Sequence, residues 1–475
     1  MDAMSVPPGA APTPNPVSRA RDTRVVVVGG GVAGLVAALE WARIGATVTL
    51  AEARDRLGGA VETVELDGLP IDLVADALPH GRPEVDALLG ELGLCDLVEN
   101  AAPLPVWLAS PSAPLPAATV LGIPANPWAG DVRRIIGWSG AWRAYLDRLR
   151  PPLTIGHERS LGRLVRARMG DRVVDRLVAP ATRALYDLSP DDIDVDIAAP
   201  GLNAALTRTG SLAGAAFDLL PAQASPARAT LRGGLGTLIR ALADRLAHFD
   251  VDVRTTSPAL QVIRDGGRWR VETPDGAVPA DAVVLATDVT AAAALLDGTM
   301  GSGRRVPAPA PGAPPARPVV TLVVEAPSLD GAPRGRAVYA SARDAPALAV
   351  AHATADWPWL AAAAGPGRHV LRVSLAAGGR VDTDDAAIAA AHAAAATMLG
   401  VPPGTVRAAA VRRVTPADPA SRLGHADRVA AIRAAAGGVA IVGAGVSGSG
   451  IAQVVADTVA EIDRQRSAVL WPSRG

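Results

Sequence analysis

The feature that most constrains the fold of this chain is a set of three glycines between a predicted strand and a predicted helix. Residues 24–28 (RVVVV) are a continuous β-branched run, typical of a buried parallel strand, and residues 36–45 (VAALEWARIG) have helical spacing. Gly29 permits a tight turn, Gly31 lets the backbone approach a pyrophosphate, and Gly34 lets the helix pack close to the strand. Because the helix N-terminus also offers unpaired N–H groups to phosphates, the turn predicts a nucleotide-binding β–α–β unit.

An acidic residue at the end of the following strand supports this interpretation. Residues 46–52 (ATVTLAE) predict the second strand, and Glu52 can accept hydrogen bonds from a ribose diol. A glycine-rich turn in an unrelated α/β domain is the alternative. Strand, helix and acidic residue are all in register here, so we expect the chain to bind a dinucleotide.

Composition excludes several classes of function. The 46 Lys+Arg residues nearly balance the 47 Asp+Glu residues, which argues against a basic nucleic-acid surface. Cys95 is the one cysteine and the seven histidines show no metal spacing, so we expect no internal disulfide and no metal site. The sequence contains no lysine, which excludes Schiff-base chemistry and a phosphate loop with its lysine.

The residues after Glu52 favour FAD as the dinucleotide. In FAD proteins of the glutathione-reductase and amine-oxidase type, this stretch resembles E-x-x-x-R-x-G-G followed by a hairpin and an Asp, and here Arg56, Gly58, Gly59 and Asp72 fill those positions. A second glycine turn near the C-terminus fits the same type, because its helix would point a positive N-terminus at the flavin, where negative charge collects on reduction.

The C-terminal part of the chain therefore repeats the pattern of the N-terminal part. Residues 437–462 again predict a strand, a glycine turn and a helix, while residues 131–188 are helical in pattern and residues 251–287 predict consecutive strands. The predicted fold class is α/β: a split Rossmann-like FAD-binding domain with an inserted mixed-sheet substrate domain and a helical region. The predicted division is a disordered tail (1–22), a first FAD-binding segment (23–100), a substrate/helical region (101–227), a second FAD-binding segment (228–300), a second substrate-domain segment (301–434), a third FAD-binding segment (435–465) and a tail (466–475).

Over most of residues 24–462 the sequence resembles the protoporphyrinogen/coproporphyrinogen oxidases, within the flavin amine oxidase superfamily. The more specific segments are ALYDLSPDDIDVDIAAPGLNAAL (184–206), TLRGGLGTLIRALADRL (230–246) and GSGI (448–451). The resemblance implies that hydrogens are removed from a porphyrinogen carbon framework onto FAD, with O2 reoxidising the flavin and no metal taking part. It also implies FAD contacts at Gly29, Gly30, Gly31, Val32, Ala33, Gly34, Glu52, Ala53, Arg56, Gly59, Ala60, Val74, Ala75, Asp76, Ala77, Ala259, Ser449, Gly450 and Ile451.

Three positions depart from the family pattern. Ala60 stands where Lys or Arg is usual, and Val74 stands where Gly is usual. Before the final glycine, Ser449 or Ser447 stands where an aromatic residue or Arg is usual. A valine side chain could crowd the flavin ring. A divergent paralogue acting on an amine or another polycyclic substrate therefore stays open, as does a degenerate, non-catalytic FAD-fold protein, although the lack of lysine and 3% aromatic content disfavour an amine oxidase.

Catalytic residues are less clear from the sequence. Porphyrinogens carry propionates, so an enzyme for them needs arginines that bind carboxylates. Arg82, next to Pro83, aligns with a region that lines the family's substrate pocket, but a solvated surface arginine is the favoured interpretation. Tyr186 lies in a family motif, with a core tyrosine as the alternative, and Arg183 lies one helical turn before it.

The expected partners are a porphyrinogen-like substrate and O2, without nucleic acid. Residues 2–19 contain prolines and no apolar core, so they do not resemble a signal peptide, and no segment qualifies as a transmembrane helix. We therefore expect a cytoplasmic protein. A peripheral membrane contact through the Arg-rich segment 131–188 stays open, and the oligomeric state is not predicted.

Overall fold

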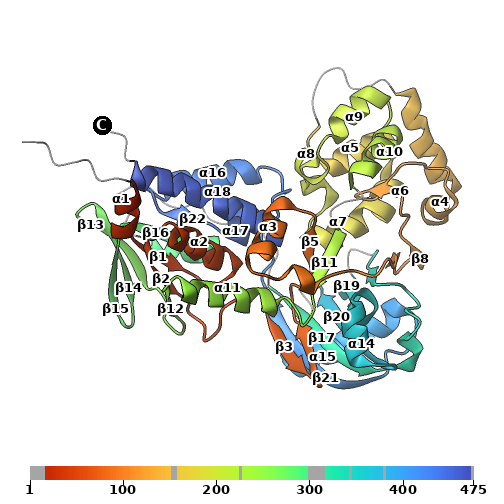
Figure 1. Cartoon of the computed structure of the whole chain (residues 1–475). Helices are drawn as coiled ribbons and strands as arrows, with labels where there is room; N and C mark the ends of the chain where they lie inside the picture. The colour runs from red at the N-terminus through yellow and green to blue at the C-terminus, as the bar shows by residue number, and fades with distance from the viewer. Residues whose placement is uncertain are drawn as a thin grey trace, which may run out of the picture.

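The computed structural model describes residues 16–150, 158–223, 227–297, 316–341, 345–377 and 381–471. Figure 1 shows three regions: a nucleotide-binding region around a parallel sheet at the left, a helical region at the upper right, and a region built on a large sheet at the lower right. The expected α/β class, with a split Rossmann-like domain, an inserted mixed sheet and a helical region, is confirmed.

The nucleotide-binding region is built on five parallel strands that come from distant segments of the chain. In spatial order they are β12 (Asp252–Arg254), β2 (Thr47–Ala51), β1 (Arg24–Val28), β16 (Ala282–Leu285) and β22 (Ala440–Ile441). The valine run places β1 in the middle of the sheet, where both faces are covered and apolar residues are needed on each.

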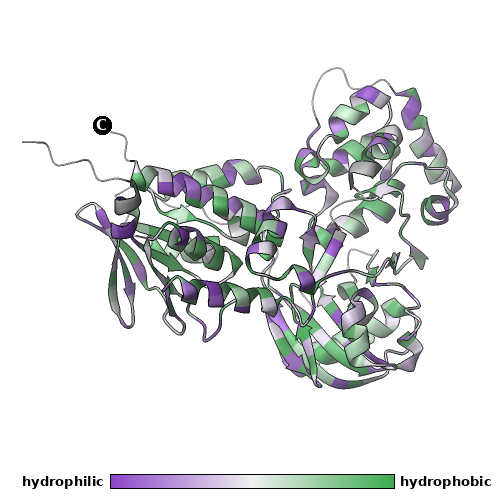
Figure 2. Ribbon diagram, viewed as in Figure 1, coloured by the Kyte–Doolittle hydropathy of each residue, from purple (hydrophilic) through white to green (hydrophobic). Residues whose placement is uncertain are grey.

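The two faces of this sheet carry separate hydrophobic cores. Val25 and Val27 point into a core shared with three helices, whereas Val26 and Val28 point into a core on the opposite face. The first core is covered by α2 (Val32–Arg43), α11 (Gly236–His248) and α18 (Ile451–Leu470). The second is covered by β13 (Gln261–Asp265), β14 (Arg268–Thr273), β15 (Gly276–Ala280), α12 (Val289–Leu295) and α16 (His425–Ala435). Figure 2 shows the apolar character of the central strands of this sheet.

Several element boundaries differ from those predicted. A portion of the expected tail 1–22 is helix α1 (Pro16–Asp22), which is held against α18 because Arg19 Nη1 donates to the Leu470 carbonyl at 2.8 Å. Helix α18 itself continues past residue 465, because its apolar face stays buried as far as Leu470. Helix α16 starts before the boundary at 434 and packs into the nucleotide-binding region through Ile432. Most of the predicted linker 301–317 lies outside the described residues.

The helical region forms around one apolar core. Its helices are α4 (Gly130–Tyr145), η2 (Leu146–Leu149), α5 (Leu161–Met169), α6 (Asp171–Val173), η3 (Val174–Val178), α7 (Ala179–Tyr186), η4 (Pro190–Asp192), α8 (Val195–Ala198), α9 (Leu202–Thr209) and α10 (Leu212–Gln223). A buried ion pair between Asp147 and Arg168 joins η2 to α5 inside this region. The short strands β9 (Thr119–Val120) and β10 (Ile123–Pro124) close the core on one side.

The large-sheet region is built on seven strands in which all neighbours except β18 and β7 are antiparallel. Its spatial order is β21 (Thr405–Val414), β17 (Arg317–Glu325), β20 (Arg368–Leu375), β19 (Ala347–His352), β18 (Ala337–Tyr339), β7 (Val106–Leu108) and β8 (Ala113–Pro114). Helix α15 (Asp384–Leu399) covers one face. The other face is covered by α13 (Ala353–Asp356) and α14 (Pro358–Ala364).

Short elements connect the three regions. Strand β11 (Ala227–Leu231) pairs with β5 (Leu78–His80) on one side and β6 (Val98–Asn100) on the other. The hairpin of β3 (Thr63–Leu66) and β4 (Leu69–Asp72) packs its apolar residues against α14. The remaining short helices are α3 (Pro83–Glu91), η1 (Cys95–Leu97), η5 (Pro327–Leu329) and α17 (Ala444–Ser447).

Membrane-spanning helices were sought in the described portion of the chain. None of its helices is both long enough and apolar enough to cross a bilayer.

Candidate functional site

The first glycine turn joins β1 to α2, and the structure accounts for its three glycines in different ways. A Cβ on Gly34 would lie 1.8 Å from the Gly29 carbonyl oxygen, so no side chain fits there. Gly29 has a φ of +104°, and a Cβ would lie 2.7 Å from the Ala286 carbonyl oxygen. At Gly31 the nearest atom to a Cβ would be the Cα of Gly59, 3.9 Å away. Gly29 and Gly34 are therefore required by the fold, whereas the space beside Gly31 is open to a ligand.

The start of α2 offers hydrogen-bond donors to that space. The helix begins at Val32 after Gly31, without a side-chain cap, so its first N–H groups, including those of Val32 and Ala33, have no partner within the helix. Such N–H groups, together with the positive end of the helix dipole, suit a phosphate group. The predicted contacts Gly31, Val32 and Ala33 thus lie where a pyrophosphate can be held.

Glu52 lies at the end of β2 and is buried against the same turn. Its Oε2 accepts from the Gly30 N–H at 2.6 Å and its Oε1 from the Arg54 N–H at 2.8 Å. A carboxylate has about four lone-pair sites. Two of them stay available for ribose hydroxyls, so Glu52 both orders the turn and fits the predicted dinucleotide.

A second pair of glycines, Gly58 and Gly59, lies beside the first glycine turn. The first turn, Glu52 and this pair together form what is called the cradle below. The Gly58 N–H donates to the Gly30 carbonyl at 2.8 Å, and a Cβ on Gly59 would lie 3.1 Å from the Cα of Gly31. Arg56 holds the loop from outside, because its Nη2 donates to the Gly59 carbonyl at 3.1 Å and to Glu62 at 3.0 Å. Its guanidinium therefore supports the loop, while Ala53 and Ala60 are exposed beside it.

The predicted FAD contact Ala259 lies beyond β12. The Ser257 N–H donates to the Glu52 carbonyl at 2.9 Å, and the Thr256 N–H donates to the Arg54 carbonyl at 2.8 Å. These bonds hold the segment that leads to Ala259 beside the Glu52 end of the cradle. Ala259 is half-buried against the core of the nucleotide-binding region.

The C-terminal glycine turn lies next to the first one. Strands β1 and β22 are parallel members of one sheet, so the turns that follow them meet at the same edge. A Cβ on Gly443 would lie 3.6 Å from the Cβ of Ala33. Ser449 is exposed and Ile451 is buried at the start of α18, where the Gly450 N–H donates to the Gln453 side chain at 3.3 Å.

Asp72 ends the β3–β4 hairpin and fastens it to α11. Its carboxyl group accepts from the Leu235 N–H at 3.0 Å and from the Thr63 hydroxyl. Burial raises the pKa of Asp72 to about 6, although the bonds from Thr63 and Leu235 oppose that rise. Asp72 therefore acts as a connector between two sequence motifs, the hairpin and the glycine turn before α11.

Asp76, in the predicted flavin-contacting segment 74–77, is held by two arginines. Arg372 Nη1 lies 2.8 Å from its Oδ2, and Arg228 Nη2 donates to its Oδ1 at 3.2 Å. Trp357 Nε1 donates to its Oδ2 at 3.2 Å. Burial works against the charged carboxylate, but the two arginines outweigh it and lower the pKa of Asp76 to about 2. The Asp76 side chain is therefore engaged within the protein, and the backbone of its loop is what can face a cofactor.

The network around Asp76 continues into the large-sheet region. Arg228 also forms an ion pair with Asp356, and its guanidinium lies 4.6 Å from the ring centroid of Trp357. Tyr339 on β18 belongs to the same electrostatic group, and burial raises the pKa of its hydroxyl. Ion pairs thus join the segment 74–77 to β11 and α13, and the neutral Tyr339 hydroxyl on β18 lies beside them.

Sequence reasoning missed the residues that hold Asp76. Arg372 stands inside the apolar strand HVLRVSL, and an arginine in such a run is a signal of a buried, paired charge. Arg228 and Asp356 gave no comparable signal, because each lies near a turn where a solvated charge is common. Only the fold brings these three side chains to one loop.

The three catalytic candidates fall on two elements. Arg82 is exposed at the N-cap of α3. Arg183 and Tyr186 share α7, which packs against β18 and β19. Arg183 Nη1 donates to the Ser341 carbonyl at 3.4 Å, and burial raises the pKa of the Tyr186 hydroxyl. The structure therefore brings Arg183 and Tyr186 together and leaves Arg82 apart.

Metal-ligating side chains do not gather in the described residues. No group of three or more His, Cys, Asp or Glu side chains there could hold a metal ion. Cys95 is exposed with a free thiol.

Comparisons with known proteins agree with this geometry. The family model described as flavin containing amine oxidoreductase matches residues 32–449. A coproporphyrinogen III oxidase of Mycobacterium tuberculosis is 34% identical over 430 residues, 86% of this chain and 89% of the relative. A coproporphyrinogen III oxidase of Propionibacterium freudenreichii is 31% identical over 372 residues, 70% of this chain and 69% of the relative. The crystal structure of a candidate protoporphyrinogen oxidase from Exiguobacterium sp. 255-15 shares the fold, with a TM-score of 0.79, 23% identity, and coverage of 94% of this chain and 98% of that one.

Proposed function

The chain belongs to the flavin containing amine oxidoreductase family and is an FAD-dependent oxidoreductase, and from that premise we propose that it oxidises a porphyrinogen, with coproporphyrinogen III as the first substrate to test and O2 as the electron acceptor. The observation that carries the proposal is the 34% identity to a coproporphyrinogen III oxidase over 86% of the chain. The relatives' names concern porphyrinogens, and the lack of lysine argues against the water-positioning lysine of many amine oxidases.

The residues of the cradle fit FAD in distinct roles. The N–H groups at the start of α2 face the open space beside Gly31 and would hold the pyrophosphate. Glu52 would accept from the ribose, and the helix that follows Gly450 would direct its N-terminus toward the flavin ring. When bound, FAD supplies the acceptor for hydrogen removed from a substrate carbon.

We propose that the substrate lies where α7 faces β18 and the segment 74–77. Arg183 on α7 would bind a propionate, since a guanidinium pairs with a carboxylate through two parallel hydrogen bonds. The Tyr186 and Tyr339 rings both pack on the core of the helical region and would provide an apolar wall. In this arrangement the protein orients a C–H bond and excludes water, and the charged network behind Asp76 keeps the loop in place.

The visible absorption spectrum of the purified protein, followed by anaerobic mixing with coproporphyrinogen III, tests the proposal. We expect a flavin spectrum that bleaches on mixing and returns when O2 is admitted, with formation of H2O2. A flavin spectrum that stays unchanged would overturn the substrate, and an amine substrate that bleaches it would support the amine alternative. A colourless protein that cannot be loaded with FAD would contradict the flavoenzyme itself.

The proposed propionate anchor has its own test. Replacing Arg183 by Gln should raise KM for coproporphyrinogen III about tenfold or more, because a hydrogen bond to a charged group is lost, while the flavin spectrum stays the same. Arg240→Gln is the matched control, since Arg240 is exposed on α11 and far from α7. Equal KM values for the two variants would remove Arg183 from the substrate site.

An exposed aromatic group on the helical region supports a peripheral membrane contact, which we propose as a second property. Trp138 is 69% exposed and Trp142 is 56% exposed, and both rings contact Trp128. Arg133 lies over the Trp138 ring at 4.2 Å, so cations border the aromatic side chains. Co-sedimentation with anionic vesicles should fall when Trp138 and Trp142 are both replaced by Ser. Equal sedimentation of the variant and the original chain would exclude this contact.

A further inference from the structure

The C-terminal glycine turn packs against the segment 418–425, which ends at the first residue of α16. Gly448 in the turn has a φ of +90°, and a Cβ on it would lie 2.9 Å from the backbone nitrogen of Ala420. The backbone of the segment therefore lies directly beside the turn. The predicted FAD contacts 449–451 follow Gly448 in the chain.

A hydrogen bond from His425 also joins this segment to the turn. His425 is buried, and its Nε2 lies 2.8 Å from the carbonyl oxygen of Val446 in α17. A carbonyl oxygen only accepts, so Nε2 carries a hydrogen and donates it. This bond fixes a peptide unit that lies three residues before Ser449.

The other nitrogen of the His425 ring faces Asp418. Nδ1 lies 3.3 Å from Oδ2 of Asp418, and Arg428 Nη2 donates to the same oxygen at 2.7 Å. Burial works against the charged carboxylate, but the hydrogen bonds from His425 and Arg428 outweigh it and hold the pKa of Asp418 below its ordinary value. Arg422 Nε lies 2.5 Å from Oδ1 of the same group. Both neighbours of the His425 ring are therefore acceptors, so the ring donates from both nitrogens.

The segment is also attached to the helical region. The Ser421 carbonyl accepts from the Asp194 N–H at 2.6 Å, and the Leu423 N–H donates to the Asp192 carbonyl at 2.9 Å. These bonds fix the segment independently of the glycine turn. His425 therefore offers the Val446 carbonyl a donor that does not move with the turn.

The turn needs such a support because of its composition. Gly448 and Gly450 have no side chains that could hold them, and glycine restricts the backbone less than any other residue. The same turn leads into α18, whose positive N-terminus we expect to face the flavin, where negative charge collects on reduction. A displaced turn would therefore bind FAD more weakly, and the reduced form most of all.

We propose that His425 is a positioning residue of the flavin site: it holds the Val446 carbonyl and thereby sets residues 449–451 against the flavin ring. The proposal rests on the proposed placement of the flavin beside this turn. It does not depend on which substrate reduces the flavin.

Two variants separate the bond to Val446 from the other contacts of the ring. A glutamine amide reaches about as far as Nε2 of histidine, so His425→Gln can still donate to the Val446 carbonyl. An asparagine amide reaches only about as far as Nδ1, so His425→Asn retains a donor toward Asp418 and loses the bond to Val446. Both variants are neutral and lack the ring, so a difference between them reports the bond to Val446.

Fluorescence titration with FAD and a spectroelectrochemical titration of the FAD-loaded protein provide the readouts. In His425→Asn we expect the affinity for oxidised FAD to fall about tenfold. We expect the flavin reduction potential to fall by about 30 mV, which corresponds to a further tenfold loss for the two-electron-reduced form. His425→Gln should stay within about twofold of the original FAD affinity.

His392→Asn is the matched control. His392 Nε2 lies 2.9 Å from the Gly404 carbonyl, so the same type of bond is lost in the large-sheet region, and the flavin should keep its affinity and potential. Unchanged flavin properties in His425→Asn overturn the proposal. Equal losses in His425→Asn and His425→Gln overturn it as well, because they would assign the effect to the ring and not to the bond with Val446.

A measurement on the original chain does not depend on the folding of a variant. The ¹⁵N resonance of His425 Nε2 should shift when bound FAD is reduced with dithionite, because charge then develops on the flavin beside the turn, and that of His392 Nε2 should not. An unchanged His425 resonance overturns the proposal. None of these readouts uses coproporphyrinogen III, so failure of that substrate and failure of the His425 proposal are distinguishable.

Discussion

The two ends of the proposed FAD site are built in different ways. At the nucleotide end, between Gly29 and Gly59, the geometry comes from backbone contacts: glycines without room for a side chain and N–H groups that face open space or Glu52. At the other end the segment 74–77 has no glycine, and its position depends on Asp76 and the charges around it. The nucleotide end depends on the close approach of backbone atoms, and the segment 74–77 depends on buried ion pairs. The two ends should therefore respond differently to mutation and to pH.

The largest effect is expected from adding a methyl group at the nucleotide end. Gly34→Ala would place a Cβ 1.8 Å from the Gly29 carbonyl oxygen, so β1 and α2 would have to separate. We expect the free energy of unfolding to fall by about 4 kcal/mol or more, measured by urea denaturation.

Gly31→Ala is the matched comparison within the same turn. Gly31 has a φ of −74°, which alanine adopts freely, and its Cβ would meet only Gly59 within 4 Å. Its stability should stay within about 1 kcal/mol of the original, but the methyl group would occupy the approach of the pyrophosphate and weaken FAD binding by about tenfold or more. Full FAD affinity in this variant would mean that the open space beside Gly31 is not the pyrophosphate site.

At the other end the next largest effect should follow from removing the shared carboxylate. Asp76→Leu removes the carboxylate that Arg228 and Arg372 share, so that Arg372 loses its ion pair with Asp76 and Arg228 keeps its ion pair with Asp356. Breaking a buried pair costs about 3–5 kcal/mol, and because the Arg228 side chain is 33% exposed we expect a loss of about 2–3 kcal/mol in the free energy of unfolding. Visible circular dichroism of the flavin should change as well.

Two further variants sharpen this result. Asp218→Leu breaks the exposed pair with Arg208 and should cost less than about 1 kcal/mol. Combining Asp76→Leu with Arg372→Met should recover some of the lost stability, because one uncompensated charge is removed. If the double variant is as unstable as the sum of the single ones, the charges do not act on one another.

This difference also explains how far the sequence could lead. The nucleotide end could be predicted because its residues lie within one β–α–β unit, in which the spacing of residues along the chain determines where they lie in space. These residues are Gly29, Gly31, Gly34 and Glu52. The network behind Asp76 was not, because its members lie on β11, α13 and β20, more than a hundred residues from the loop. Local patterns describe elements, whereas long-range ion pairs depend on the packing of whole domains.

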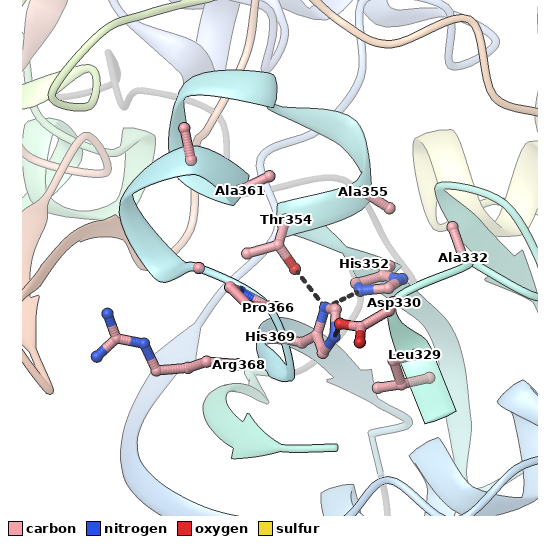
Figure 3. Close-up of a pocket in the computed structure, with 12 residues that line it drawn as sticks. Leu329, Asp330, Ala332, His352, Thr354, Ala355, Ala361, Pro366, Arg368 and His369 are labelled. Carbon is pink, nitrogen blue, oxygen red and sulfur yellow. Dashed lines mark hydrogen bonds and ion pairs between the residues drawn. The ribbon is translucent and has the colours of Figure 1, made fainter. Parts of the chain in front are cut away.

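Helix α1 could not be predicted from the sequence for a related reason. The tail expected over residues 1–22 ends in helix α1, which forms a bond to the other end of the chain that no local pattern contains. The contact between His352 and His369 (Figure 3) was equally hidden, because the two residues lie on different strands and meet only through the pairing of β19 with β20.

Opposite pH dependences should separate two aspartates that are four residues apart. The pKa of Asp72 is about 6 in the folded chain against 3.8 as its ordinary value, so the folded state binds more protons and stability falls as pH rises from about 4 to 6. The pKa of Asp76 is about 2, so its contribution is present above about pH 4 and is lost as pH falls toward 2.

Asparagine variants isolate each contribution. Relative to the original chain, Asp72→Asn should gain about 2 kcal/mol of stability between pH 4.5 and 7.5, measured by urea denaturation at both values. Asp76→Asn should be destabilised at neutral pH, and that deficit should shrink below pH 4. Two variants with the same dependence on pH would contradict the contrast between the connector and the ion-paired loop.

The smallest effect is expected at Val74, where the family resemblance described in the sequence analysis implies glycine. Val74 is half-buried, and a glycine there would add freedom to the unfolded chain, at a cost of about 0.5–1 kcal/mol. Because the Asp76 ion pairs hold the loop, its backbone should keep its position and FAD affinity should change less than about threefold, with a small shift in the flavin absorption maximum. Fluorescence titration with FAD measures this, and Val74→Ala shows whether side-chain size or backbone freedom is responsible. A loss of FAD binding in Val74→Gly alone would mean that valine stiffness, and not the charge network, orders the ring end of the site.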